Sequence, residues 1–307
     1  MARGTTSEAT IAAPAIEARP RSARAQLAAD LLTLTKPKVQ SLLLLTTATT
    51  MLVAGSPSLW LIVATCVGGY LSAGGAGAVN HWYDRDIDAQ MARTATRPVP
   101  SGRIAPEFAL WFGLGLGAAS VAWLLIFTNP LAAALSFSGF LGYTLMYTVW
   151  LKRRTWQNIV WGGAAGAVPP LVGWAAVTGE ISGLSIYLFA IVFFWTPPHF
   201  WALSLLMKDE YAKVGVPMLP VVRGEQETRR QIVLYSVLLY AVTQLPYCAG
   251  GLGAIYLVAS LGLGVAFIAL AVYLARNPSR KAALQLYLFS LLYLALLFCS
   301  MVADVKL

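Results

Sequence analysis

Long stretches without a charged side chain alternate with short charged segments along this chain. Residues 39–83, 108–151, 231–275 and 282–303 contain no Asp, Glu, Lys or Arg, and residues 155–207 contain one, Glu180. A helix needs about 20 mainly apolar residues to cross a bilayer, so the four longer stretches can each cross twice. Clusters of Gly, Pro and small polar residues, which favour turns, divide them near residues 55–58, 128–130, 178–180 and 250–253. The pattern therefore predicts four helical hairpins followed by a ninth membrane-spanning helix.

The composition agrees with a membrane protein of many spans. Hydrophobic residues make up 58% of the 307 residues and charged residues make up 11%, which is far from the balance of a soluble domain. Cys66, Cys248 and Cys299 stand alone within predicted spans, so we interpret them as small apolar residues. The expected fold class is an all-α polytopic membrane protein.

Lysine and arginine lie on one side of this arrangement. Of the 22 Lys and Arg residues, only Lys306 falls on the side opposite to the rest. Loops rich in Lys and Arg face the cytoplasm, so the pattern predicts a cytoplasmic N-terminus. It also accounts for the net charge of +9, and we therefore expect no nucleic-acid partner.

The first 29 residues contain four Arg and two Glu but no apolar segment. They lack the features of a secretory signal, and a disordered cytoplasmic tail is favoured over an organelle transit peptide. Residues 30–307 are expected to form one domain that is embedded in the lipid bilayer. A bacterial cytoplasmic membrane is favoured over an organelle inner membrane.

Three polar residues at the end of the first charge-free stretch share one helix face. Asn80, Asp84 and Asp88 are spaced by four residues, so on a helix they stack over two turns. Two carboxylates and a carboxamide are hard oxygen ligands that suit Mg²⁺, which usually binds a few carboxylates together with substrate phosphates. The stripe predicts a diphosphate ligand on the cytoplasmic side. The alternative is a solvated helix end, and we keep that interpretation for Asp86 and a packing role for His81, which lie off the stripe.

Basic side chains and a second acidic segment follow on the same side of the membrane. Arg93, Arg97 and Arg103 come directly after the stripe, and arginine binds phosphate oxygens well. A later loop contains Asp209, Glu210 and Lys213. The two acids can form a second Mg²⁺ cluster facing the first, or Asp209 and Lys213 can form a salt-bridged helical turn.

These motifs resemble the UbiA-type intramembrane prenyltransferases over about residues 30–303. The family signature N-x-x-x-D-x-x-x-D is matched by Asn80, Asp84 and Asp88, the following R-P by Arg97-Pro98, and Y-[ST]-x-x-L-K by Tyr147 to Lys152. The resemblance implies nine transmembrane helices around a central cavity and a Mg²⁺-dependent loss of diphosphate that leaves an allylic carbocation. It implies that Asp84, Asp88 and Lys152 are catalytic. It implies that Mg²⁺ is held by Asn80, Asp84, Asp88 and by Asp209, Glu210 or both, and helix continuity slightly favours Asp209. The implied diphosphate ligands are Arg93, Arg97, Lys152 and Lys213.

Two further stretches resemble the branch of this family that modifies heme. They are "WTPPHFWALSL" at 195–205 and "DEYAKVGVPMLPVV" at 209–222, in which Lys213 replaces the second Asp expected of quinone-precursor enzymes. This branch implies transfer of farnesyl from farnesyl diphosphate to a vinyl group of heme b, with addition of water. Heme A synthase and a terminal oxidase are then candidate partners for the product. The implied acceptor contacts are His199, Trp195, Trp201 and Tyr147.

The prolines before His199 are expected to break their helix, which is tolerated in a membrane only where the backbone is buried or lines a cavity. Phe200 is a further aromatic near the acceptor. Two alternatives stay open. One is a family relative that prenylates 4-hydroxybenzoate or another aromatic or chlorin acceptor. The other is a cation-coupled transporter, which is disfavoured because the acids cluster at helix ends rather than near the middle of the membrane.

Overall fold

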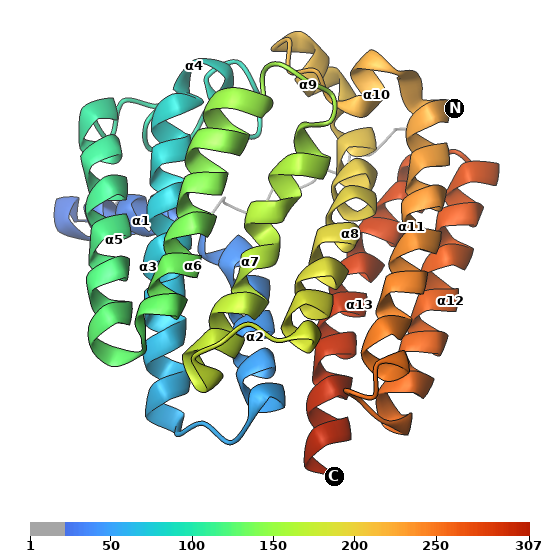
Figure 1. The fold of residues 1–307 in the computed structure, drawn as a ribbon. Coiled ribbons are helices and arrows are strands. Elements are labelled where there is room, and N and C mark those ends of the chain that lie inside the picture. The colour runs from blue at the N-terminus through green and yellow to red at the C-terminus, as the bar shows by residue number, and fades with distance from the viewer. Residues whose placement is uncertain (1–21) are drawn as a thin grey trace, which may run out of the picture.

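The computed structural model describes residues 22–307 as long helices packed side by side, with short helices at the end that carries α4, α9 and α10 (Figure 1). The first half of the chain forms α1 (Ala23–Leu34), α2 (Pro37–Ala54), α3 (Leu59–Tyr83), α4 (Arg85–Asp88), α5 (Pro106–Phe127), α6 (Pro130–Leu141) and the π-helix η1 (Gly142–Leu151). The second half forms α7 (Asn158–Thr178), α8 (Gly183–Leu206), α9 (Lys208–Lys213), α10 (Leu219–Val222), α11 (Gly224–Cys248), α12 (Ala254–Arg276) and α13 (Arg280–Lys306).

The all-helical membrane fold is confirmed for the described residues, and each predicted turn separates two helices. Eight segments are long and apolar enough to cross a membrane: α3, α5, α6 with η1, α7, α8, α11, α12 and α13. The remaining long helix, α2, is less apolar because it contains Lys38, Gln40 and four threonines. Gln40 and these threonines are buried, since α2 packs against α3, α7 and α13. A ninth crossing by α2 and a central cavity stay predictions.

Small residues let α3 and α5 approach each other closely. A Cβ atom added to Gly75 would lie 2.5 Å from the carbonyl oxygen of Gly113, and one added to Gly113 would lie 2.7 Å from that of Gly75. Ser120 also donates a hydrogen bond of 2.7 Å to the carbonyl of Gly68. Close backbone packing through small residues is a general means of helix association in membranes. This contact holds α3 against α5 on the approach to the end of α3, where the acidic stripe begins.

The long segment made of α6 and η1 changes its winding along its length. The α-helix α6 continues directly into η1, in which the backbone bonds skip five residues instead of four; for example, the Lys152 amide donates to the carbonyl of Tyr147 at 2.9 Å. Such π-helices are rare, usually span a single turn and are often found at functional sites. Here the π-helix covers ten residues and contains the Tyr147-Thr148 motif.

The predicted break at Pro197-Pro198 is wrong. The helix α8 runs without interruption from Gly183 to Leu206 through both prolines, and α7 likewise contains Pro169 and Pro170. Each proline removes one backbone donor. Packing of α8 against α7, α11 and α13 keeps the backbone helical despite these losses.

The N-terminal segment contributes a helix that is anchored to a loop. Helix α1 begins at Ala23, so it includes the last residues of the predicted tail, and residues 1–21 of that tail lie outside the described residues. Buried Asp30 of α1 accepts hydrogen bonds from the Arg103 guanidinium at 3.0–3.1 Å. This pair connects α1 to the loop between α4 and α5.

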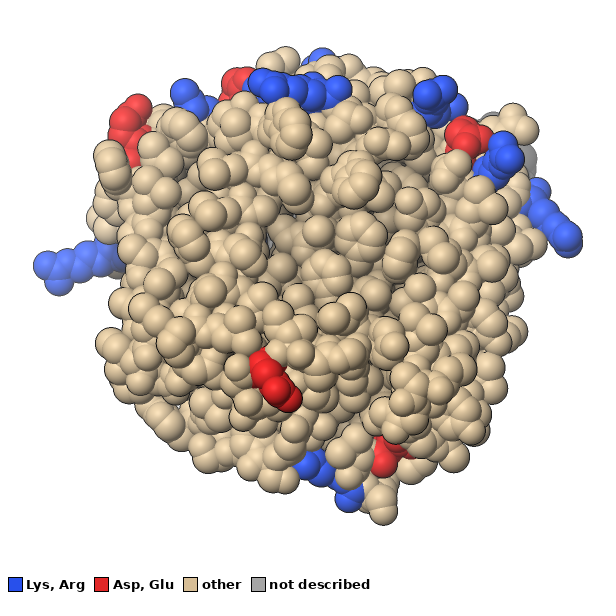
Figure 2. Space-filling model, in the orientation of Figure 1, with Lys and Arg blue, Asp and Glu red and all other residues tan. Residues whose placement is uncertain are grey.

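Charged side chains are distributed as a membrane requires. On the face shown in Figure 2 most of them lie along the upper rim, at the end that carries α4, α9 and α10, and the wide middle is almost free of charge. Lys306 lies at the opposite end, where it donates to the carbonyl of Gly55 at 2.7 Å. Among the described residues, Lys306 is therefore separated, as predicted from the loops, from the basic residues that lie at the end with α4, α9 and α10.

The α3–α5 contact can be tested with a pair of alanine substitutions. Gly113→Ala should destabilise the protein by about 1–3 kcal/mol, because the added methyl group meets the Gly75 backbone. Gly115→Ala, on the same helix but facing open space, should be neutral or slightly stabilising because alanine favours helix. Thermal unfolding of both variants in detergent measures this difference, and equal stability would contradict the close contact.

Candidate active site

The helical spacing of the acidic stripe (Asn80, Asp84 and Asp88) is maintained where α3 ends. The amide of Asp84 donates to the carbonyl of Asn80 at 2.9 Å, and the amide of Asp88 donates to that of Asp84 at 2.8 Å. These helical bonds carry the face across the junction of α3 and α4, so the predicted one-sided arrangement is present. Asn80, Asp84 and Asp88 are 3%, 0% and 3% exposed, which excludes a solvated helix end.

Cations from separate parts of the chain surround the two buried carboxylates. Lys152 forms a salt bridge with Asp84, and Arg153 approaches the other oxygen of Asp84 at 3.4 Å. Arg97 lies 2.6 Å from Asp88. The Asn80 amide donates to Asp84 at 2.7 Å, which leaves its carbonyl oxygen for another partner. Buried charges are stable only when they are paired in this way.

Lys36 is a site residue that sequence reasoning missed. Its ammonium donates to the Asn80 carbonyl oxygen at 2.5 Å and lies 3.5 Å from the Tyr143 hydroxyl. Within residues 22–307 it is the only non-glycine residue with a positive φ, 54°, a conformation that costs energy and recurs at functional sites. Burial, together with the charges of Arg97 and Lys152, lowers the pKa of Lys36 to about 7.

The π-helix places several polar groups on the same face. Thr148 accepts from the Asn80 amide at 3.2 Å, and the Tyr143 and Tyr147 rings lie 5.4 Å apart. Lys152 follows directly and reaches Asp84. The predicted motif from Tyr147 to Lys152 therefore meets the acidic stripe.

Asp86 and His81 differ from the stripe, as expected from their positions. The Asp86 side chain is 56% exposed, and its hydrogen bonds with Arg153 hold its pKa below the usual range. His81 is 1% exposed, and neither ring nitrogen has a partner among the described residues. A buried imidazole without partners is costly, and the contacts of His81 do not assign it a function.

An apolar cluster joins the two acidic segments. Ile87 and Met91 after α3 pack in one cluster with Tyr211, Val216 and Met218 of the later loop. Tyr147 and Phe200 pack against the same cluster. The loops thus meet at the same end of the protein, although within residues 22–307 no three acidic, His or Cys side chains gather closely enough to form a metal cluster.

The structure favours Glu210 over Asp209 as the acid of the second segment. Asp209 is exposed, whereas the Oε2 atom of Glu210 is buried and has no hydrogen-bond partner. An orphaned buried carboxylate oxygen is a group that a cation would satisfy. The oxygens of Asn80, Asp84, Asp88 and Glu210 are of the hard kind that suits Mg²⁺, although the acids are not gathered into one cluster within residues 22–307.

The other predicted diphosphate ligands are not all at the stripe. Arg97 and Lys152 contact it. Arg93 and Lys213 are exposed and have no ion-pair partner among residues 22–307, and the salt bridge considered for Asp209 and Lys213 does not form there. Arg103 binds Asp30 instead.

The predicted acceptor residues of α8 differ in their contacts. Trp195 and His199 stack at 4.2 Å between ring centroids, and His199 contacts Phe200 edge-on at 5.7 Å. Trp201 is 1% exposed and packs against Tyr235 in the main core. Trp195 and Trp201 both lie in the main core, and Trp195 additionally connects to His199 and, through it, to Phe200.

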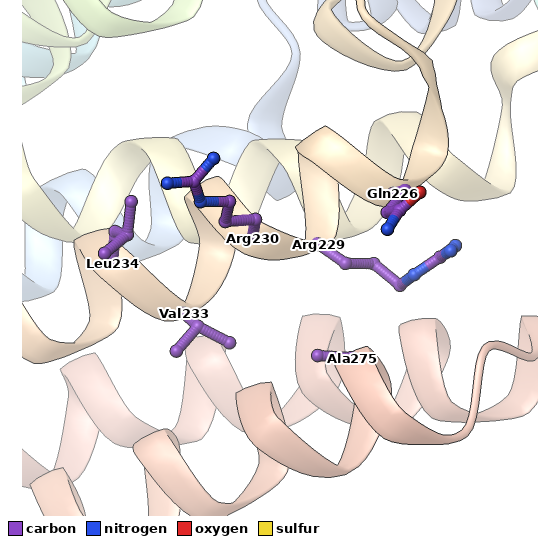
Figure 3. Close-up of a pocket in the computed structure, with 6 residues that line it drawn as sticks. All are labelled: Gln226, Arg229, Arg230, Val233, Leu234 and Ala275. Atoms are coloured by element: carbon purple, nitrogen blue, oxygen red, sulfur yellow. The ribbon is translucent and has the colours of Figure 1, made fainter.

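A separate surface hollow lies between α11 and α12. The close-up in Figure 3 shows its lining of Gln226, Arg229, Arg230, Val233, Leu234 and Ala275. The Arg229 side chain pairs with Glu225, and Arg230 pairs with Glu227. The hollow contains none of the predicted site residues.

The chain belongs to the UbiA prenyltransferase family, whose model matches residues 43–297. Among its relatives, a protein of Symbiobacterium thermophilum named protoheme IX farnesyltransferase is 51% identical over 293 residues, covering 94% of this chain and 98% of that protein. A protein of the same name from Chloroflexus aurantiacus is 55% identical over 278 residues, covering 90% of this chain but 47% of that protein. The chain thus spans about half the length of some relatives and nearly the full length of others.

Solved structures share the fold. A digeranylgeranylglyceryl phosphate synthase matches with a TM-score of 0.75 and 17% identity, covering 91% of this chain and 99% of that one. A UbiA homolog from Archaeoglobus fulgidus, bound to DMAPP and Mg²⁺, matches with a TM-score of 0.67 and 16% identity, covering 89% and 99%. The expected helical architecture of the family is therefore confirmed.

The choice between the two later acids can be tested by metal binding. With inorganic diphosphate present, Glu210→Gln should weaken binding of Mn²⁺, an ion that takes the same oxygen ligands, by about tenfold. Asp209→Asn should leave binding unchanged because that side chain points to solvent. Electron paramagnetic resonance of free Mn²⁺ measures both affinities. The reverse order would assign the metal to Asp209.

Proposed function

We propose that this protein transfers a farnesyl group from farnesyl diphosphate to a vinyl group of heme b, with addition of water, and releases diphosphate and heme O. The observation that carries the proposal is the buried pair Asp84 and Asp88, held beside Asn80 and surrounded by Lys36, Arg97 and Lys152. A site of this kind has both the oxygen ligands and the positive charge that a metal diphosphate needs.

The relatives support the choice of substrates. Proteins named protoheme IX farnesyltransferase are 50–55% identical to this chain over most of its length. A solved homolog with the same fold binds DMAPP, a prenyl diphosphate, together with Mg²⁺. Lys213 in place of a second Asp supports heme over a quinone precursor as the acceptor.

Asn80, Asp84, Asp88 and Glu210 would hold Mg²⁺. When bound, the ion would neutralise charge on the diphosphate and orient it. Lys152 and Arg97 now neutralise the carboxylates that would hold the ion. Both side chains are flexible, so they can turn from the carboxylates to the phosphate oxygens of the substrate.

The same cations then assist the departure of diphosphate. The bond between the allylic carbon and the diphosphate oxygen breaks as negative charge grows on that oxygen, and Lys36, Lys152 and Arg97 stabilise this charge. Arg93 and Lys213, both exposed, can assist when substrate is bound. The allylic cation bonds to one vinyl carbon of heme, which leaves the positive charge on the neighbouring carbon. Water adds to that carbon and loses a proton, which gives the hydroxyl group.

Aromatic side chains would protect the cation and receive the acceptor. The Tyr147 ring packs between the stripe and the apolar cluster, while Trp195 and His199 lie behind Phe200. Aromatic faces stabilise cations and stack on flat rings. The complete burial of Asp84 supports a site from which water is largely excluded before addition. A role for Trp201 would be indirect, through the packing of α8.

The site is proposed to face the cytoplasm of a bacterial cell. The bias of Lys and Arg toward the end that carries the acidic loops supports this orientation. The acceptor and product are apolar and can exchange through the lipid bilayer. Transfer of the product to heme A synthase or a terminal oxidase stays a prediction.

The function is tested by incubating the purified protein in detergent with heme b, farnesyl diphosphate and Mg²⁺. Mass spectrometry of the porphyrin should detect heme carrying farnesyl plus water, and EDTA should abolish the product. Consumption of 4-hydroxybenzoate without modification of heme would assign the protein to the quinone branch. No product with any acceptor would contradict prenyl transfer and favour a transporter.

The acidic stripe is tested by removing charge without changing size. Asp84→Asn and Asp88→Asn should each lower turnover by about 100-fold or more, because the ion and its diphosphate lose a ligand. Asp86→Asn is the matched control, since its exposed side chain lies off the stripe. Initial rates should be compared after membrane insertion has been verified, and full activity of both stripe variants would refute the metal assignment.

A further inference from the structure

The imidazole of His199 is fixed in place by three neighbours. Its ring stacks on Trp195 at 4.2 Å and 18°, and on Tyr287 of α13 at 4.9 Å and 26°. The indole of Trp195 donates to the carbonyl of Ser290 at 2.8 Å, which connects α8 to α13. Because rings cover both faces of the imidazole, only its edge can meet a ligand.

The hydrogen bonds of Ser290 favour one tautomer of the His199 imidazole. The Ser290 hydroxyl lies 2.6 Å from His199 Nδ1 and donates its hydrogen to the carbonyl of Tyr287 at 2.6 Å. A hydroxyl has one hydrogen to donate, so toward the imidazole it acts as the acceptor. Nδ1 of His199 therefore carries the proton, and Nε2 presents a lone pair.

The Nε2 atom of His199 is open, in contrast to the nitrogens of His81. It has no hydrogen-bond partner within residues 22–307, but it is partly accessible to solvent. Both nitrogens of His81 also lack a partner, but they are fully buried. The chain has only these two histidines. A neutral imidazole held through Nδ1, with Nε2 free, is the arrangement found in metal-binding histidines.

A chain of side-chain contacts links His199 to the proposed site of diphosphate departure. Its ring contacts Phe200, and Phe200 packs against the apolar cluster that contains Ile87 and Tyr211. Ile87 lies on α4 beside Asp88, and Tyr147 packs against the same cluster. Phe200 and the apolar cluster therefore connect the imidazole to the acidic stripe.

We propose that His199 Nε2 binds the iron of the heme substrate as an axial ligand, and that Ser290 is a positioning residue that holds the required tautomer. This inference rests on the proposed function. The lone pair of Nε2 forms a coordinate bond to iron while Nδ1 keeps its proton on Ser290. The bond would hold the porphyrin against α8 through its iron.

Iron coordination gives a test that does not depend on turnover. The absorption spectrum of ferric heme b with the wild-type protein should show an imidazole-bound iron, and His199→Ala and His199→Gln should remove this signature. His81→Ala is the matched control and should keep it. Binding of heme b relative to metal-free protoporphyrin IX should be at least about tenfold tighter in the wild type, and this preference should vanish in His199→Ala.

Chemical rescue separates ligation from a loss of folding. His199→Gly leaves room at the edge of the ring, and added imidazole should restore the spectrum of a histidine-bound heme. Ser290→Ala should weaken heme binding by about tenfold or more because the tautomer is no longer held. Ser290→Thr keeps the hydroxyl and should restore the wild-type spectrum, which a purely structural role of Ser290 would not explain.

The outcomes distinguish this inference from the function on which it rests. If the wild type makes heme O but His199→Ala and His199→Gln keep the imidazole spectrum and the preference for iron, ligation by His199 is wrong and the function stands. If Ser290→Ala keeps the wild-type spectrum and affinity, the role of Ser290 is wrong. If the wild type neither binds heme b nor makes heme O, the proposed function itself fails.

Discussion

The structure depends on the pairing of two carboxylates that are buried at the end of a membrane helix. Asp84 and Asp88 are almost inaccessible to solvent, and each is paired with a cation from another segment. Without such pairing, burial of either charge would be strongly unfavourable. The loop after α4 supplies Arg97, the segment after η1 supplies Lys152 and Arg153, and the turn before α2 supplies Lys36. The strained backbone of Lys36 and the unusual winding of η1 both serve to bring positive charge to this point.

Much of this arrangement could be predicted from local patterns. Charge-free stretches and turn residues located the helices, because membrane crossings have a characteristic length. Spacing by four placed Asn80, Asp84 and Asp88 on one face, and the helical bonds across the end of α3 preserve that spacing. By contrast, α2 is less apolar than the other long helices because its polar residues face the interior, and a sequence does not show which helices will cover them.

The parts that could not be predicted depend on tertiary contacts. Lys36 looks like an ordinary basic residue before a span, and only the fold brings it to Asn80. Asp209 and Glu210 are adjacent in sequence, and the direction of α9 decides which of them is buried. The continuous helix through Pro197 and Pro198 depends on neighbouring helices that hold α8. Ser290 carries no sequence signal, because its contact with His199 joins residues 91 positions apart.

The π-helix has a consequence for how this protein can evolve. The π-helix covers ten residues, in which each hydrogen bond spans five residues rather than four. Its length sets the rotation about the helix axis of the residues that follow it. A π-helical turn contains more residues than the 3.6 of an α-helix, so loss of one residue between Gly142 and Leu151 would rotate Lys152 by somewhat less than about 100° around the helix axis, away from Asp84. Turns at the far end, such as residues 55–58, can gain or lose residues without this effect. Selection should therefore act on the length of η1 as strictly as on the identity of the acidic residues.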